Sequence, residues 1–161
     1  MHTSGRSIVM DLDKFLWRQF RELTVTELYA VLRLRSEVFV VEQQCIYSDL
    51  DGKDEESRHL IASRAGTLLG YLRLQPANRT CEFARIGRVV VDPKARGQRL
   101  GCRLVAEAIE EARRLFGPVP VKVSAQSHLE GFYRQFGFLR TSADYTDDGI
   151  VHCDMVRSEQ A

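Results

Sequence analysis

The spacing of apolar residues predicts two amphipathic helices in this chain. The first begins at the capping box Thr24-Val25-Thr26-Glu27, where the Thr24 hydroxyl is placed to accept from the backbone N–H of Glu27. Two charged residues, Arg35 and Glu42, fall on its apolar stripe, whose other members are Leu28, Val31, Leu32, Val38 and Phe39. The second helix covers 100–116, where apolar residues recur every three or four positions, and Gly117-Pro118 ends it.

Short runs rich in β-branched and aromatic residues predict strands around these helices. The runs 59–64 and 68–75 form a hairpin across Ala65-Gly66-Thr67, and a second hairpin joins 138–145 to 150–156. A short helix over 128–136 ends at Gly137. The remaining strands are predicted at 15–20, 83–91 and 120–124.

The resulting order is β-α-β-β-β-α-β-α-β-β, which is typical of the α/β class. We expect a three-layer domain in which a mixed central sheet of about six to seven strands is flanked by helices on both faces. Residues 1–14 are predicted to be a flexible segment, and residues 15–161 a single domain.

Composition narrows the classes of partner. The 23 Lys and Arg residues nearly cancel the 22 Asp and Glu residues, so no overall field favours nucleic acid or an anionic membrane. The four cysteines are widely spaced, which favours reduced thiols over a disulfide framework or a metal site. No signal-peptide pattern or membrane-length apolar run is found, and we expect a cytoplasmic protein without a metal cofactor.

The run Val89-Val90-Val91-Asp92-Pro93-Lys94-Ala95-Arg96-Gly97-Gln98-Arg99-Leu100-Gly101 carries the clearest chemical signal. A β-branched strand stops at Asp-Pro, and a basic turn containing glycine leads into a helix. Main-chain N–H groups at the positive end of a helix dipole bind anionic oxygens. The pattern predicts a phosphate site, although an ordinary strand-to-helix connection with solvated arginines explains the run equally well by itself.

A second run, Phe132-Tyr133-Arg134-Gln135-Phe136-Gly137-Phe138, shifts that balance. Together the two runs resemble the GNAT superfamily of acyl-CoA-dependent N-acetyltransferases, whose phosphate turn has the pattern R/Q-x-x-G-x-G/A. Further segments are similar to the ElaA-like branch of that superfamily, and they lie at 32–43, 49–52, 58–59 and 125–129. The resemblance spans nearly the whole chain and implies the same fold as the predicted order of elements.

The resemblance implies acetyl-CoA as the cosubstrate and assigns residues to its parts. The pyrophosphate would bind the turn, the amide-bearing arm would lie along the edge of the valine strand, and a primary amide would touch the arm. The implied cofactor-binding residues are Val89, Val90, Val91, Arg96, Gly97, Gln98, Arg99, Leu100, Gly101, Cys102, Gln126 and Tyr133. Arg103 would add charge. Arg99 stands where the superfamily usually has glycine, and we expect it to adopt helical φ without strain.

Tyr133 is the predicted catalytic residue at the thioester, because a phenol near the sulfur can protonate or hydrogen-bond the leaving thiolate. Burial among Phe132, Phe136 and Phe138 is the alternative reading, and the resemblance favours the catalytic one. The acceptor amine also needs a base, for which Glu42, His59 and His128 are equal candidates.

Each of these candidates has a structural alternative. Glu42 could instead form a buried ion pair with Arg35 or be a charge at the end of the helix, and a lone histidine is more often structural. Asp49 and Asp51, in the acid-rich segment 43–57, could attract a cationic acceptor or simply form turns. Arg85 and Arg88 could pair with these acids or with an acceptor carboxylate.

The preferred hypothesis is an enzyme that acetylates a primary amine of a small molecule or peptide by direct attack in a ternary complex. A covalent route through Cys102 is disfavoured because this thiol belongs to the phosphate end. The alternatives are a non-catalytic acyl-CoA-binding module and, less well supported, a nucleotide-binding protein. Oligomeric state stays open, with a homodimer as one option.

Overall fold

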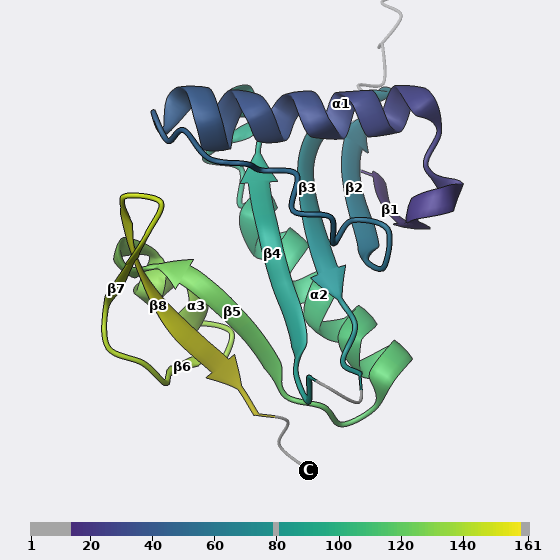
Figure 1. The fold of residues 1–161 in the computed structure, drawn as a ribbon. Helices are drawn as coiled ribbons and strands as arrows, with labels where there is room; N and C mark the ends of the chain where they lie inside the picture. The colour runs from purple at the N-terminus through teal and green to yellow at the C-terminus, as the bar shows by residue number, and fades with distance from the viewer. Residues whose placement is uncertain (1–13, 79–80, 159–161) are drawn as a thin grey trace, which may run out of the picture.

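The protein is described from a computed structural model that covers residues 14–78 and 81–158. Its described strands form one eight-stranded sheet with the order β1-β2-β3-β4-β5-β8-β6, and β7 also pairs with β8 (Figure 1). Only β4 and β5 run parallel, so the sheet is mixed. The strands are β1 (Lys14–Gln19), β2 (Arg58–Arg64), β3 (Thr67–Gln75), β4 (Ala84–Val91), β5 (Val121–Gln126), β6 (Leu139–Arg140), β7 (Tyr145–Asp147) and β8 (Ile150–Arg157).

One face of the sheet packs against α2 (Leu100–Phe116), which lies behind the strands in Figure 1. The apolar stripe of α2 supplies Leu104, Val105 and Ala108 to the main core. Alternate residues of the hairpin, such as Leu60 and Leu72, meet them from the sheet. The short helix α3 (Glu130–Arg134), which follows the 3-10 turn η4 (Ser127–Leu129), adds Tyr133 to the same core.

The opposite face packs against α1 (Val25–Arg35), which begins at the predicted Thr24 capping box. A π-helix, η2 (Ser36–Glu42), continues α1 without a break. Three of its neighbours in the sheet, Ile61, Tyr71 and Val90, form a second apolar cluster with Val31, Leu34 and Val38. The predicted three-layer α/β domain is therefore confirmed, with eight strands in place of six to seven.

The site depends on the divergence of β4 from β5. These parallel strands pair only at Ala84 with Val121, Arg85 with Lys122 and Ile86 with Val123. Beyond Ile86 they separate, and among the described strands the carboxyl end of β4 pairs only with β3 (Figure 1). A wedge-shaped opening in the middle of a sheet exposes strand edges that a ligand can pair with.

Several boundaries differ from those predicted. The predicted strand 138–145 is divided into β6 and β7, which pair with β8 in registers two residues apart. The acid-rich segment 43–57 forms no helix and crosses the sheet face beside α1 (Figure 1). The predicted flexible segment 1–14 lies outside the described residues except for Lys14, which begins β1. None of the described helices is long and apolar enough to cross a membrane.

Candidate active site

The turn between β4 and α2 forms the first part of the site. None of the main-chain N–H groups from Gly97 to Cys102 donates a hydrogen bond to an acceptor in the described part of the chain. The 17-residue helix α2 also begins without a side-chain cap. Because a long helix needs partners for its first N–H groups, this end is equipped to bind an anion.

A cavity of about 330 Å³ opens over these amides. Arg96, Gly97, Arg99, Gly101 and Cys102 line it from the turn, and the remaining lining residues are Val91, Ala95, Leu100 and Phe132. Gly97 has a φ of +77°, a conformation that side chains rarely adopt. We call this cavity with its amides the anion cradle. Its shape and unpaired donors fit a diphosphate.

Arg99 does not adopt the helical conformation predicted for it. Its φ is 58° and its ψ 19°, which is the left-handed region. A side chain there crowds its own backbone, and the cost for a residue other than Gly, Asn or Asp is about 1 kcal/mol or more. The prediction of an unstrained arginine was therefore wrong, because Arg99 is the residue before α2 and lies outside the helical φ/ψ region.

The charged side chains near the cradle are partly engaged elsewhere. Arg96 forms an ion pair with Glu42 at 2.9 Å, in which both side chains are nearly half exposed. Arg64 donates to the Gln98 side chain at 3.1 Å. The Arg103 guanidinium lies 4.5 Å from the centre of the Phe15 ring and does not line the cradle. The backbone therefore contributes more to this site than the predicted arginine cluster does.

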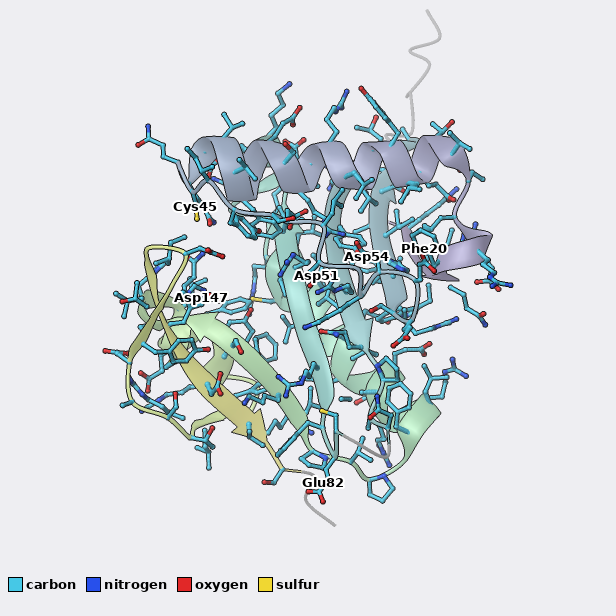
Figure 2. All side chains as sticks on the ribbon, in the orientation of Figure 1. Phe20, Cys45, Asp51, Asp54, Glu82 and Asp147 are labelled. Atoms are coloured by element: carbon cyan, nitrogen blue, oxygen red, sulfur yellow. The ribbon has the colours of Figure 1, made fainter. Side chains whose placement is uncertain are left out.

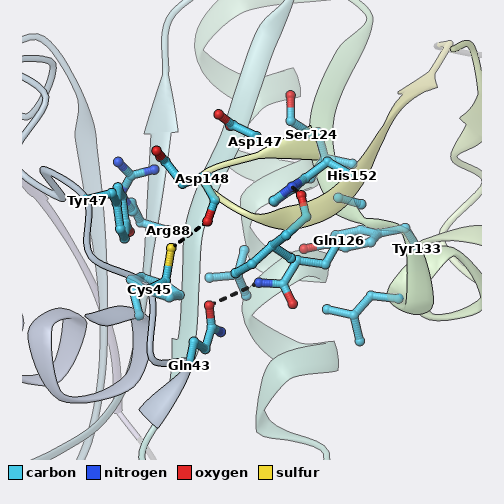
Figure 3. A pocket seen from close by; sticks show the side chains of 17 residues that line it. Gln43, Cys45, Tyr47, Arg88, Ser124, Gln126, Tyr133, Asp147, Asp148 and His152 are labelled. Carbon is cyan, nitrogen blue, oxygen red and sulfur yellow. Dashed lines mark hydrogen bonds between the residues drawn. The ribbon is translucent and has the colours of Figure 1, made fainter. Parts of the chain in front are cut away.

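A second cavity, of about 200 Å³, lies where β4 and β5 separate (Figure 3). We call it the splay cavity. Its walls come from the end of η2 and the following segment, from β4 and β5, from α3 and from the β7–β8 hairpin. Val89 and Tyr133 line the splay cavity, whereas Val91 and Phe132 line the anion cradle. One strand edge and one helix thus connect the two cavities.

Tyr133 lines the splay cavity while being only 5% exposed. Its ring makes edge contacts with Phe132 and Phe138. Burial raises the pKa of Tyr133 to about 12, and no hydrogen-bond partner of its hydroxyl occurs among the described residues. The phenol therefore stays protonated near neutral pH and keeps a free donor beside the cavity. Tyr133 can therefore pack in the core and still present its hydroxyl to the cavity, so a structural role does not exclude a catalytic one.

Two contacts join the walls of the splay cavity across its mouth (Figure 3). The Gln126 side-chain amide donates to the Gln43 side-chain oxygen at 3.2 Å. The buried Cys45 thiol donates to the main-chain oxygen of Asp148 at 2.9 Å. These contacts place Gln126, the predicted arm-binding amide, in the cavity wall and hold the β7–β8 hairpin against the segment after η2.

The segment 43–57 is attached to the sheet by what we call the arginine–aspartate cluster. Its members are Arg35, Arg73, Arg88, Asp49, Asp51 and Asp54. Asp54 accepts from Arg35 and from Arg73 at 2.9 Å each. The Asp51 and Asp54 side chains lie in front of the β-strands in Figure 2. Arg88 and Tyr47 extend from this cluster into the splay cavity.

The three predicted base candidates lie outside both cavities. Glu42 is exposed and paired with Arg96, so an inward-facing Glu42 and a buried pair with Arg35 were wrong. His59 is buried, and its ring nitrogens contact the Tyr71 hydroxyl at 2.7 Å and the Asp54 main-chain oxygen at 2.9 Å. His128 is exposed in η4. The structure does not bring them to Tyr133.

Comparison with known proteins decides the family. The family model described as an acetyltransferase (GNAT) domain matches residues 22–159 of this chain. The chain belongs to the GNAT acetyltransferase family. It is 40% identical over 138 residues to the protein ElaA of Escherichia coli K12, covering 84% of this chain and 90% of ElaA. The predicted membership and the ElaA-like branch are confirmed.

Solved GNAT structures support the same conclusion. An acyl-CoA N-acyltransferase from Pseudomonas aeruginosa superposes with a TM-score of 0.87 and 44% identity, covering 91% of this chain and 100% of that one. Escherichia coli ElaA superposes with a TM-score of 0.86 and 36% identity over the same shares. The protein is thus an acyltransferase of the GNAT family.

Several titratable residues of this GNAT site were not predicted from the sequence, and His152 is one of them. His152 lines the splay cavity together with Tyr133 and Gln126. It lies in the last strand, where the local pattern marks it only as an alternating strand position. His152 is identified as a cavity residue only by the pairing of β5 with β8, which places it opposite Gln126. That pairing joins segments distant in sequence.

Proposed function

We propose that the protein transfers an acetyl group from acetyl-CoA to a primary amine by direct attack within a ternary complex. The observation that carries this proposal is that neighbouring residues of the same strand and the same helix line the two cavities. Unpaired main-chain amides lie at one end and the Tyr133 hydroxyl at the other, connected along β4 and α3. This is the arrangement that a diphosphate-bearing thioester requires.

The carboxyl end of β4 is suited to hold the amide-bearing arm of the cosubstrate. Val89 and Val91 contribute to the splay cavity and the anion cradle respectively, while the Val90 side chain is buried in the α1 cluster. Because β4 has no partner toward β5 beyond Ile86, its main-chain groups on that side can pair with an amide arm. Gln126 adds a primary amide to the same cavity.

Tyr133 would act on the departing sulfur. As the amine nitrogen forms its bond to the carbonyl carbon, the carbon–sulfur bond breaks and a thiolate leaves. A phenol with a pKa of about 12 is a weaker acid than an ordinary thiol with a pKa of ~8.5. Full proton transfer would therefore be uphill by about 5 kcal/mol. This difference favours a hydrogen bond from Tyr133 that stabilises the thiolate over complete protonation.

The charge of the splay cavity favours a cationic acceptor. The lysine, arginine, aspartate and glutamate side chains that line it are Arg88, Asp147 and Asp148. Arg88 is neutralised by Asp49 at 2.7 Å and by Asp51 at 3.5 Å. The hairpin carboxylates thus leave the mouth negative, which raises the local concentration of a protonated amine.

The test is release of free thiol from acetyl-CoA in the presence of polyamines, amino acids, aminoglycosides and peptides. We expect turnover with at least one amine class, and Tyr133→Phe to lower kcat by about 10²-fold through the lost hydrogen bond. Calorimetry should show unchanged CoA affinity for this variant. Tight CoA binding without turnover of any amine would instead identify a non-catalytic acyl-CoA-binding module.

A further inference from the structure

The wall of the splay cavity contributed by β8 presents one histidine, His152. Its Cα pairs across the sheet with Gln126 of β5 on one side and with Tyr145 of β7 on the other. Strand alternation sends the next residue, Cys153, into the main core. The His152 side chain therefore lies on the opposite sheet face from that core, on the same face as Gln126.

The hydrogen bond of His152 determines which ring nitrogen is available. Its Nδ1 atom lies 2.8 Å from the main-chain oxygen of Ile150. A carbonyl oxygen can only accept, so Nδ1 must carry the proton. In the neutral imidazole the lone pair then belongs to Nε2, which has no hydrogen-bond partner among the described residues. The ring is also stacked on Tyr145, with centroids 6.1 Å apart, and this restricts its orientation.

We propose that His152 is the general base that deprotonates the acceptor amine through Nε2. The proposal rests on the acetyl transfer proposed above and deepens it. Nε2 accepts a proton from the alkylammonium, which frees the nitrogen lone pair to form the bond to the carbonyl carbon. The second N–H proton is lost to water as the carbon–sulfur bond breaks. The electron pair of the broken carbon–sulfur bond leaves with the thiolate, which the Tyr133 hydroxyl stabilises. His152 returns the proton to water, so no other reactant is needed.

The topology separates these two roles in space. Tyr133 belongs to the main core and reaches the splay cavity from the α3 side of the sheet. His152 reaches it from the other face of β8. The amine attacks the carbonyl carbon from one face of the thioester plane while the leaving sulfur lies in that plane, so the base and the thiolate donor must approach from different directions, as residues on opposite sheet faces can. Figure 3 shows both residues around the same cavity.

Other groups in the cavity are less suited to this role. The Cys45 thiol is engaged with Asp148, and Arg88 is engaged with Asp49. Burial raises the pKa of Tyr47 to about 12, which leaves it protonated. The titratable or charged groups that line the cavity with His152 are Cys45, Tyr47, Arg88, Tyr133, Asp147 and Asp148. Tyr145 of β7 pairs with His152, and Asp154, two residues along β8, is held by Lys122 of β5.

The kinetic test compares His152→Gln with wild type on two kinds of acceptor. Alkylamines are mostly protonated near neutral pH and need a base, whereas hydroxylamine is mostly unprotonated and needs none. We expect the variant to lose about 10²-fold or more in kcat/KM on alkylamines and to keep its rate on hydroxylamine. The defect on alkylamines should shrink as pH rises toward the pKa of the amine. An equal loss on both acceptors, or no loss, would overturn the proposal.

Two controls keep the result interpretable. Glu110→Gln changes an exposed residue of α2 outside both cavities and should retain wild-type rates. CoA affinity measured by calorimetry should be the same in all three proteins. Added imidazole should restore part of the alkylamine rate to His152→Ala, which a purely structural role would not allow.

A second measurement tests His152 without any acceptor. In protein labelled with ¹⁵N-histidine, the His152 signals are assigned by their loss in His152→Gln. We expect the neutral Nδ1–H form, with Nε2 unprotonated and open to solvent exchange. A proton on Nε2 in the neutral ring would refute the base assignment even if transfer activity is present. If the wild-type protein transfers acetyl to none of the amines, the proposed function fails. The nitrogen that carries the proton in the neutral His152 ring still tests whether Nε2 could act as a base.

Discussion

Replacing Asp54 with Asn tests whether the arginine–aspartate cluster holds the splay cavity together. Asp54 is the only carboxylate of the cluster that contacts both of the deeply buried arginines, Arg35 and Arg73, among the described residues. These arginine side chains are 1% and 2% exposed, and Asp54 is 13% exposed. The substitution keeps the side-chain shape and removes one negative charge.

The expected cost follows from the charge balance. Three arginines and three aspartates cancel in the cluster, so Asp54→Asn leaves one net positive charge close to the sheet. Removing one partner of a buried ion pair costs about 3–5 kcal/mol, and a retained amide acceptor places this variant near the lower value. A domain stability of roughly 5–15 kcal/mol would still leave the protein folded.

The pH dependence gives a second signature. Burial disfavours the Asp54 carboxylate, but the hydrogen bonds from Arg73 and Arg35 outweigh it and lower its pKa. The hydrogen bond from Arg73 likewise lowers the pKa of Asp51. A lowered folded pKa contributes stability above the unfolded value of ~3.9, and this stability disappears as pH falls through the folded pKa. The difference in the free energy of unfolding between wild type and Asp54→Asn should therefore become smaller below about pH 4.

The assay is urea unfolding at neutral and acidic pH, with Glu56→Gln as the matched control. Glu56 lies in the same segment, is exposed, and undergoes the same change of charge. We expect Glu56→Gln to change the free energy of unfolding by no more than about 0.5 kcal/mol. Limited proteolysis should cut the segment 43–57 faster in Asp54→Asn. Equal stability of the two variants would refute this reasoning, and so would a difference between wild type and Asp54→Asn that grows as the pH falls.

Two further substitutions test the cradle and its neighbour. Arg99→Gly removes the strain of a left-handed arginine but makes the unfolded chain more flexible, so we expect the free energy of unfolding to be unchanged or raised by about 1 kcal/mol. Arg96→Gly, at φ −65°, relieves no strain and should lower the free energy of unfolding by about 1 kcal/mol. Equal losses for the two variants in thermal melts would contradict the strain argument. Glu42→Gln should keep kcat and modestly tighten CoA binding, because it releases Arg96, beside the anion cradle, from its ion pair with Glu42. A 10²-fold loss in kcat would instead support Glu42 as the base.

The local pattern predicted the helices and strands because each is amphipathic over its own length. Helix α2 shows this most clearly, since its stripe, its start at Leu100 and its end at Gly117 all appear in the sequence. The turn proposed to bind phosphate also carries a local signal, because its unpaired donors are consecutive main-chain groups between Gly97 and Cys102. Features that depend on contiguous residues carry their signal in the sequence itself.

Two errors came from assuming regular backbone geometry. The α-helical period puts Glu42 on the stripe of Arg35, but the π-helix joins Gln43 N–H to the Val38 carbonyl, five residues back. Wider turns rotate Glu42 out to solvent, where it meets Arg96. Arg99 was assigned helical φ because the helix pattern begins nearby, although it is the residue before α2 and adopts the left-handed conformation.

The acceptor side of the site is assembled by contacts that no local pattern contains. His152 becomes a cavity residue through the β5–β8 register, in which Gln126 and His152 are partners. A shift of one residue would turn Cys153 toward the cavity and His152 toward the core. The burial of Cys153 and Met155 opposes that shift, because it would place the imidazole among apolar side chains. The apolar residues of β8 therefore select the register that places His152, the proposed base, in the splay cavity.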